Sequence, residues 1–367
     1  MDSYKYEKTF SKNGNLMKQK LFLTVAMLVL ILLSVSLSSA TEININWRQK
    51  LDSGKVYDLK FMPGQESFVL VTDYFLEVRS CEDGLIMKSV AIPYIGAAHN
   101  IEFTPDSTKL ILAYADKIEI REIENFSLIN SYTIPEEEEF SIRFYEMIVD
   151  PVRPFIYALW IKTKGIHSTF EEYDKILIFD RETLQPIGEL TNGNDTNLRF
   201  KNIAVSKDGK YLAAMNYGVS KLIVWSLDTR QKIVDKYISD PSSKEFSEPA
   251  DIKFSELNSD KVFFTGQFFQ REGKETLEGL CIFSISENRI IDSTFATGVN
   301  SGIAHIAFFE YGQKIFLGGY MIKFINLNDM RLEYKRKYNE NNILINAGYP
   351  IYNEKKKFFL GYNPGGI

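Results

Sequence analysis

The chain has 367 residues, of which 45% are hydrophobic and 14% aromatic, so it can bury a large core as one big domain or two ordinary ones. Its net charge is −5; residues 1–40 hold five lysines against Asp2 and Glu7, so they contribute +3 and the remainder contributes −8. An acidic body excludes wrapping nucleic acid, which requires a cationic face. The two cysteines, Cys81 and Cys281, are too few for a disulfide scaffold.

Residues 1–40 form the first predicted segment, a signal peptide or signal anchor. Lys18 and Lys20 precede an apolar core at residues 21–37, and the small residues Ser38 and Ala40 follow it. This order is typical of a secretory signal that is cleaved after Ala40. The alternative is an uncleaved anchor, because this 17-residue segment is at the short limit for spanning a bilayer. Either interpretation places residues 41–367 outside the cytoplasm, as a secreted, periplasmic or cell-surface protein, with membrane contact only through the N-terminal segment.

The remaining chain repeats a unit whose clearest copy runs from Val205 to Asp228. In it the polar turn Ser206–Lys210 leads into the apolar run Tyr211–Met215, and a second turn leads into the alternating run Lys221–Leu227. Turn residues between short apolar and alternating runs favour β-hairpins over helices.

Seven copies of this unit follow one another at spacings of 42 to 56 residues. An apolar residue ends the first strand of each copy: Phe61, Phe103, Val149, Val205, Phe254, Phe308 and Ile351. A second apolar strand begins about seven residues later, and in the first six copies a third strand and a fourth strand follow. Four antiparallel strands in each of seven such repeats predict an all-β, seven-bladed β-propeller.

The turn and strand motifs resemble those of the WD-repeat superfamily and related bacterial seven-bladed propellers. Phe103-Thr-Pro-Asp-Ser107 and Val205-Ser-Lys-Asp-Gly-Lys210 are similar to that family's turn between first and second strands, and Val224-Trp225 is similar to its third-strand signature. The chain departs from the family because no repeat has the Gly-His dipeptide and only Trp225 occupies the Trp position. The resemblance implies a propeller over about residues 43–367 that serves as a binding scaffold, without defining a subfamily.

Ring closure involves both ends of the predicted propeller domain, residues 41–367. The strand-like segment 43–51 lies where a fourth strand falls relative to Phe61, so it should close the ring with the C-terminal blade, residues 343–367. In the other repeats the third strand starts about 15 residues after the first strand ends, and from Ile351 this position is Gly366. The spacing therefore predicts an incomplete seventh blade; the alternative is a loosely closed ring.

Candidate binding residues lie in long connections that should share one face of the propeller. The connection 163–174 in the third repeat and the connection 268–278 in the fifth are longer than their counterparts, and loops on a rigid scaffold often bind partners. These connections contain the candidates His167, Phe170, Tyr173, Phe268, Phe269 and Arg271. The aromatic side chains could form a platform for a peptide or sugar, or could pack their own loops onto the blades.

His99 and His305 are the candidates for the channel mouth, because each lies just before or within a predicted first strand. They could act as acid–base groups or metal ligands, although histidines bonded to the backbone are more common.

The sequence shows no recognised catalytic motif, so we expect no cofactor, no metal and no catalytic residue. The leading hypothesis is a non-catalytic scaffold for a protein or polymer partner, with its oligomeric state undetermined. The alternative is a propeller enzyme, a hydrolase or lyase with or without a metal, whose site lies at the channel mouth.

Overall fold

A computed structural model describes residues 55–92, 98–164, 171–191, 199–217, 221–238, 244–270, 276–297, 305–318, 322–328, 330–336 and 351–360. By internal contacts the chain divides into two units, Met1–Ile45 and Asn46–Ile367, and every described residue belongs to the second unit. The predicted signal or anchor at residues 1–40 and the predicted strand at 43–51 lie outside the described residues. Within the described part of the chain, no helix has the length and apolar character needed to cross a membrane.

The described residues form six four-stranded antiparallel sheets and one two-stranded sheet. Blade one contains β1 (Val56–Phe61), β2 (Ser67–Thr72), β3 (Phe75–Ser80) and β4 (Ile86–Ala91). Blade two contains β5 (Ala98–Phe103), β6 (Lys109–Tyr114), β7 (Lys117–Glu122) and β8 (Leu128–Thr133). Blade three contains β9 (Phe140–Val149), β10 (Phe155–Lys164), β11 (Glu171–Asp180) and β12 (Pro186–Leu190). Blade four contains β13 (Arg199–Val205), β14 (Tyr211–Tyr217), β15 (Lys221–Ser226) and β16 (Gln231–Tyr237). Blade five contains β17 (Lys244–Phe254), β18 (Lys261–Gln270), β19 (Thr276–Ser284) and β20 (Arg289–Thr297). Blade six contains β21 (His305–Phe309), β22 (Lys314–Gly318), β23 (Ile322–Asn326) and β24 (Arg331–Arg336). The two-stranded sheet pairs β25 (Ile351–Asn353) with β26 (Phe358–Leu360).

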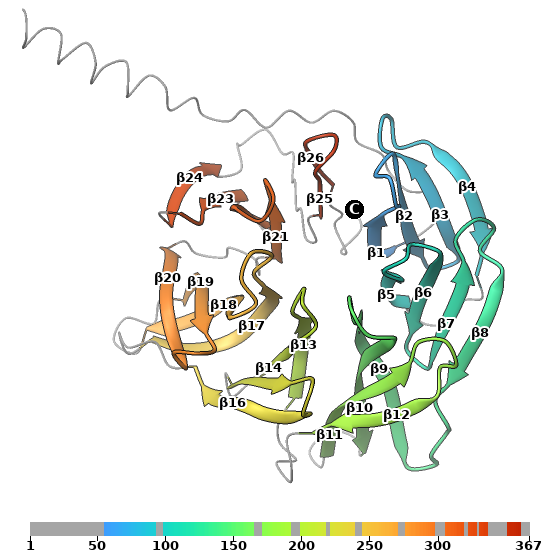
Figure 1. The fold of residues 1–367 in the computed structure, drawn as a ribbon, viewed down its shortest axis with the longest axis horizontal. Coiled ribbons are helices and arrows are strands. Elements are labelled where there is room, and N and C mark those ends of the chain that lie inside the picture. The colour runs from blue at the N-terminus through green and yellow to red at the C-terminus, as the bar shows by residue number, and fades with distance from the viewer. Residues whose placement is uncertain are drawn as a thin grey trace, which may run out of the picture. The chain divides into compact units, whose positions relative to one another are not determined.

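The sheets are the blades of a β-propeller. In every four-stranded sheet the strands follow chain order from the first strand to the fourth. The first strands β1, β5, β9, β13, β17, β21 and β25 contact one another in this order, and β25 contacts β1 again (Figure 1). The first strand of each blade therefore faces the central channel, and β25–β26 lies between blade six and blade one.

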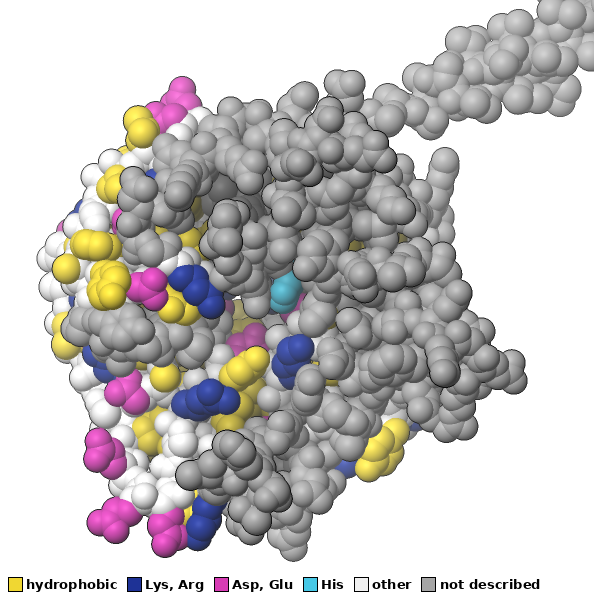
Figure 2. Space-filling view, turned by 180° about the vertical axis from the view of Figure 1, so that it is seen from behind, with side chains coloured by type: hydrophobic (Ala, Val, Ile, Leu, Met, Phe, Trp, Pro, Cys, Tyr) yellow, Lys and Arg dark blue, Asp and Glu magenta, His cyan; other side chains and the backbone are white. Residues whose placement is uncertain are grey.

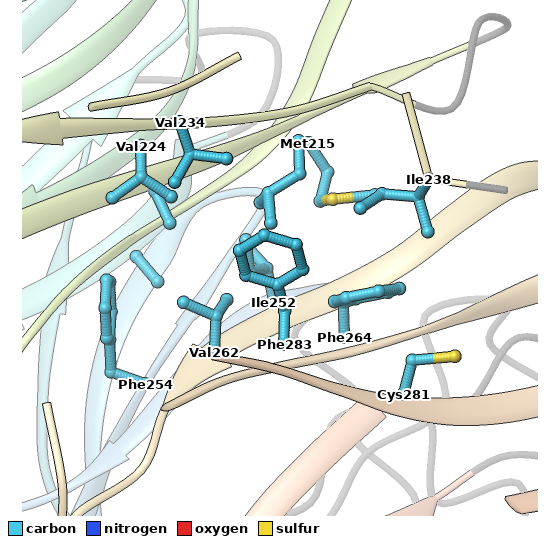
Figure 3. Packing of buried hydrophobic residues seen from close by; sticks show 13 residues of the cluster. Met215, Val224, Val234, Ile238, Ile252, Phe254, Val262, Phe264, Cys281 and Phe283 are labelled. Atoms are coloured by element: carbon cyan, nitrogen blue, oxygen red, sulfur yellow. The ribbon is translucent and has the colours of Figure 1, made fainter. Parts of the chain in front are cut away.

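The apolar second strands are buried on both faces because neighbouring blades pack against both sides of each sheet. In β14, Ala213 and Met215 pack in the cluster shared with blade five, whereas Leu212 and Ala214 pack in the cluster shared with blade three; all four are 0% exposed. Figure 3 shows Met215 and Val224 of blade four facing apolar side chains of blade five. Because successive side chains of a strand point to opposite faces of the sheet, one apolar run contributes to two hydrophobic cores.

The hairpin predicted around Val205 is present. Ser206 N–H donates to the Tyr211 carbonyl at 2.9 Å, and Gly209, at φ +69°, allows the intervening turn. Trp225 is buried and packs edge-to-face on Phe200, with ring centroids 5.9 Å apart. The residues that resembled the WD-repeat pattern therefore form a turn and a core contact of blade four.

The turn between β25 and β26 packs on the turn between β1 and β2. Asn353 donates from Nδ2 to the Gln65 carbonyl at 2.8 Å, and Lys355 and Lys356 form ion pairs with Glu66 at 2.5 and 2.6 Å. These contacts join residues almost 300 positions apart in the sequence, so they hold the C-terminal sheet against blade one.

Candidate functional site: the mouth of the central channel

The same irregularity occurs in the first strand of five successive blades. In each of them the pairing with the second strand skips one residue, which is a β-bulge: Tyr57, His99, Tyr145, Lys201 and Ala250. The next residue is polar in every case: Asp58, Asn100, Glu146, Asn202 and Asp251. These five residues occupy the same position in successive first strands, so they form a ring of polar side chains, here called the polar ring. Bulges redirect side chains and often occur near functional sites, which makes this ring a candidate site.

Four of these side chains bond each blade to the next. The carboxylate of Asp58 accepts the Ile101 N–H at 2.7 Å, and Asn100 Oδ1 accepts the Met147 N–H at 2.9 Å. In the same way, Glu146 accepts the Ile203 N–H at 2.7 Å and Asp251 accepts the Ile306 N–H at 2.8 Å. The polar ring therefore satisfies backbone donors between blades, which a buried strand edge requires.

Charged side chains surround the polar ring. Lys60 Nζ forms an ion pair with Glu102 at 2.8 Å, and Lys253 Nζ lies 3.8 Å from Asp251. His305 begins β21, and its Nδ1 lies 3.7 Å from Asp251 Oδ2. Figure 2 shows a hollow in the middle of one face, bordered by a histidine and by acidic and basic side chains. Together with the polar ring, groups from blades one to six thus converge at the channel mouth.

The carboxyl groups of the mouth differ in proton affinity. Burial raises the pKa of Glu146 to about 8, although Lys253 opposes the change, and it raises the pKa of Asp58 to about 6 against the influence of Lys60. Burial acts in the same direction on Asp251, but Lys253 and His305 beside it outweigh burial and hold its pKa below the ordinary value. At neutral pH the mouth therefore combines a protonated carboxyl at Glu146 with a carboxylate at Asp251.

The predicted long connections are, in part, extensions of strands. In blade three the β10–β11 pairing continues to Lys164 and Glu171, and in blade five the β18–β19 pairing continues to Phe269 and Thr276. The prediction that Tyr173, Phe268 and Phe269 lie in loops is therefore wrong, because Tyr173 belongs to β11 and the two phenylalanines belong to β18. Extending the ladder pairs backbone groups that a loop would leave to solvent. His167, Phe170 and Arg271 lie outside the described residues.

The two channel candidates are both in first strands. His99 is the bulge residue of β5, and His305 contributes its side chain to the mouth beside Asp251. Among the described residues, no three His, Cys, Asp or Glu side chains are grouped to hold a metal ion. Cys81 and Cys281 are buried in blades one and five.

The sequence contains a signal for the polar ring that single motifs do not reveal. Each polar residue lies three positions before the apolar residue that ends its first strand, as Asp58 precedes Phe61 and Asp251 precedes Phe254. Within one repeat this residue is an ordinary polar side chain. Only alignment of the repeats on their first strands makes its recurrence visible.

Neither the known protein-family models nor the curated proteins match this chain. Among solved structures the chain is similar to hydrazine synthase from Kuenenia stuttgartiensis, with a TM-score of 0.64 and 11% sequence identity over 88% of this chain and 97% of that chain. A likeness at this identity shows the fold and not the activity. The fold and the comparison together define the class, a β-propeller built of mostly four-stranded antiparallel blades.

Proposed function

We propose that the protein is a non-catalytic, extracytoplasmic scaffold that binds a protein or polymer partner through the face at which its first strands begin. The observation that supports this proposal is the extension of blades three and five on that face. Strands β9, β10, β11 and β18 have ten residues and β17 has eleven, whereas the first strands of the other four-stranded blades have five to seven. The extended hairpins belong to the two blades on either side of blade four. They project beside the channel mouth as hydrogen-bonded, rigid structure.

Blade three presents an ordered surface on its extension. Lys162 and Lys164 form ion pairs with Glu137 and Glu139, and Lys162 Nζ lies 3.8 Å from the centre of the Phe140 ring. Next to this ladder, Arg143 is exposed and Tyr145 is 39% exposed. Tyrosine and arginine contribute strongly to protein interfaces because they combine apolar area with hydrogen bonding. We therefore assign Arg143 and Tyr145 to the proposed binding surface.

The proposal includes a seven-bladed ring outside the cytoplasm. The sheet β25–β26 would form the inner part of blade seven, and residues 43–51 would supply its outer strand. Residues 1–40, as a cleaved signal or an anchor, would carry the propeller across the membrane. Support comes from the contacts of Asn353, Lys355 and Lys356 with the first blade and from the basic, apolar and small-residue order of the N-terminus. Fractionation of cells that produce the full chain tests the location, and recovery of the full chain in the cytoplasm would contradict it.

The partner is tested by chemical cross-linking of the full chain in its own cells. A Tyr145→Ala, Arg143→Ala double variant should lose the cross-linked species at least tenfold while its urea unfolding midpoint stays unchanged. Tyr311→Ala is the matched control, because Tyr311 is 71% exposed but lies at the opposite end of the blades, in the turn after β21. Equal cross-linking in the double variant and in the control would overturn this assignment.

A specific observation supports one alternative, a propeller hydrolase or lyase with its site at the channel mouth. Asp251 lies 3.7 Å from the His305 ring, and burial raises the pKa of the nearby Glu146 to about 8. A histidine oriented by a carboxylate can act as a general base, and a carboxyl that is protonated at neutral pH can act as a general acid. Turnover of ester or glycoside substrates that is lost in His305→Ala, with folding intact, would favour the enzyme over the scaffold.

A further inference from the structure

The bonding between blades along the polar ring has one gap, at the junction of blades four and five. Asn202 has the same register position as Asp58, Asn100, Glu146 and Asp251. The N–H that would meet it, on Ile252, instead donates to Asp251 Oδ1 at 2.8 Å. Within the described structure, Asn202 Oδ1 is buried and has no hydrogen-bond partner. A buried acceptor of this kind is costly to leave unpaired, so it points to a donor that binds there.

Carboxyl groups of neighbouring blades lie on both sides of this acceptor. Glu146 of blade three is bonded to the Ile203 N–H, which belongs to the residue directly after Asn202. Asp251 of blade five accepts the Ile252 N–H, which is the donor that Asn202 lacks. Strand β13 contacts both β9 and β17, so Asn202 lies between the strands that present the two acidic side chains.

The positive charge at the mouth is already engaged or partly solvated. Lys60 is paired with Glu102 at 2.8 Å, and the side chain of Lys253 is 46% exposed and 3.8 Å from Asp251. The half-buried Lys201 and His305 are the other basic groups described around the mouth. Burial, together with repulsion from Asp251 and Glu102, raises the pKa of Glu146 to about 8 despite Lys253. A carboxyl that retains a proton at neutral pH indicates too little positive charge around it.

We propose that the channel mouth binds a primary ammonium group at Asn202, between Glu146 and Asp251. An ammonium group has three N–H donors, which match the amide oxygen of Asn202, the carboxylate of Asp251 and a carboxyl oxygen of Glu146. The positive charge of the bound ammonium favours loss of the proton from Glu146. Tyr145, exposed directly before Glu146, offers an aromatic face of the kind that cations prefer. The group can belong to a free amine or to a lysine side chain of another protein, because both present the same head. This site shares Tyr145 with the partner surface proposed above, but Asn202, Glu146 and Asp251 are not part of that surface, so their variants test the amine site alone.

Isothermal titration calorimetry on the full chain at pH 7 tests the proposal with two probes. Cadaverine represents a free amine, with 1,5-pentanediol as its uncharged control. Nα-acetyl-lysine amide represents a protein-borne lysine, with the Nε-acetylated form as its control. We expect one or both amines to bind and neither control to bind. Binding of cadaverine alone assigns a free amine, and binding of the lysine derivative alone assigns a protein ligand.

Two asparagine variants separate the site from the fold. Asn202→Ala should weaken amine binding at least tenfold and leave the urea unfolding midpoint unchanged, because the lost oxygen makes no bond. Asn100→Ala is the matched control; it removes a bond between blades, so it should lower the midpoint and leave amine binding within twofold of the wild type. Glu146→Gln, which keeps the shape but cannot become a carboxylate when the ammonium binds, should also weaken binding at least tenfold.

Several results would overturn the proposal. These are no binding of either amine at millimolar concentration, equal binding of the uncharged controls, and unchanged affinity in Asn202→Ala. Destabilisation of Asn202→Ala as large as that of Asn100→Ala would also overturn it, because Asn202 would then have a structural partner.

Discussion

Replacement of Glu146 by glutamine should change how the stability of the propeller depends on pH. Burial raises the pKa of Glu146 to about 8 from an ordinary value of 4.5, so the folded chain binds a proton between these pH values that the unfolded chain has released. The unfolding free energy of the wild type should therefore fall as pH rises through this window and level off above about pH 8. Glutamine retains an oxygen for the Ile203 N–H but does not ionise, so Glu146→Gln should not show this loss.

The magnitude follows from the two pKa values. Their difference, 8 minus 4.5, is 3.5, and each tenfold change in proton affinity corresponds to about 1.36 kcal/mol, which gives a ceiling of about 5 kcal/mol. The channel mouth is only half-buried at Glu146, and water there weakens electrostatic effects. We therefore expect Glu146→Gln to gain roughly 2–3 kcal/mol over the wild type between pH 5 and pH 9.

Urea unfolding at pH 5, 7 and 9, followed by tryptophan fluorescence and circular dichroism, measures this difference. Titrating groups away from the mouth affect both proteins alike, so the comparison reports Glu146 together with its interactions with Asp251 and Glu102. Glu124→Gln, an exposed carboxyl in a turn of blade two, is the control and should follow the wild type. A gain of less than about 0.5 kcal/mol between pH 5 and pH 9, or an equal gain in Glu124→Gln, would refute the reasoning.

Three further substitutions test the contacts that hold the blades. Asn100→Ala should cost about 1–3 kcal/mol in urea unfolding, because the Met147 N–H loses its acceptor; no measurable cost would mean that water replaces the bond. Arg121→Ala should cost about 1–3 kcal/mol, because the buried Glu119 loses the guanidinium that lies 2.7 Å from it and keeps only Lys117, and the Phe126 carbonyl loses a donor; partial recovery of stability in the double variant with Glu119→Gln would confirm the contribution of the charge, and no recovery would contradict it. Gly209→Ala should lower thermal stability by about 1–2 kcal/mol, because Gly209 has φ +69°; an unchanged melting temperature would show that the turn accepts a side chain.

The sequence by itself determined the strands and the repeat. Apolar runs such as Tyr211–Met215 can form strands buried on both faces, and the residues of turns such as Ser206–Lys210 set where the chain reverses. Because each blade is one repeat of the chain, the periodicity alone predicted the order of the sheets around the ring. The contacts between successive first strands follow that order.

Only the tertiary structure decided where the chemistry lies. Glu146, Asn202 and Asp251 are about 50 residues apart from one to the next, and their proximity depends on the bulge in each first strand and on closure of the ring. Burial and charge at such a site are sums over several blades, which no single segment encodes. Likewise, the local composition of 163–174 and 268–278 predicted loops, but continued pairing across the hairpins turned much of them into strands. Backbone pairing is decided by the partner strand, so sequence patterns within one segment could not reveal it.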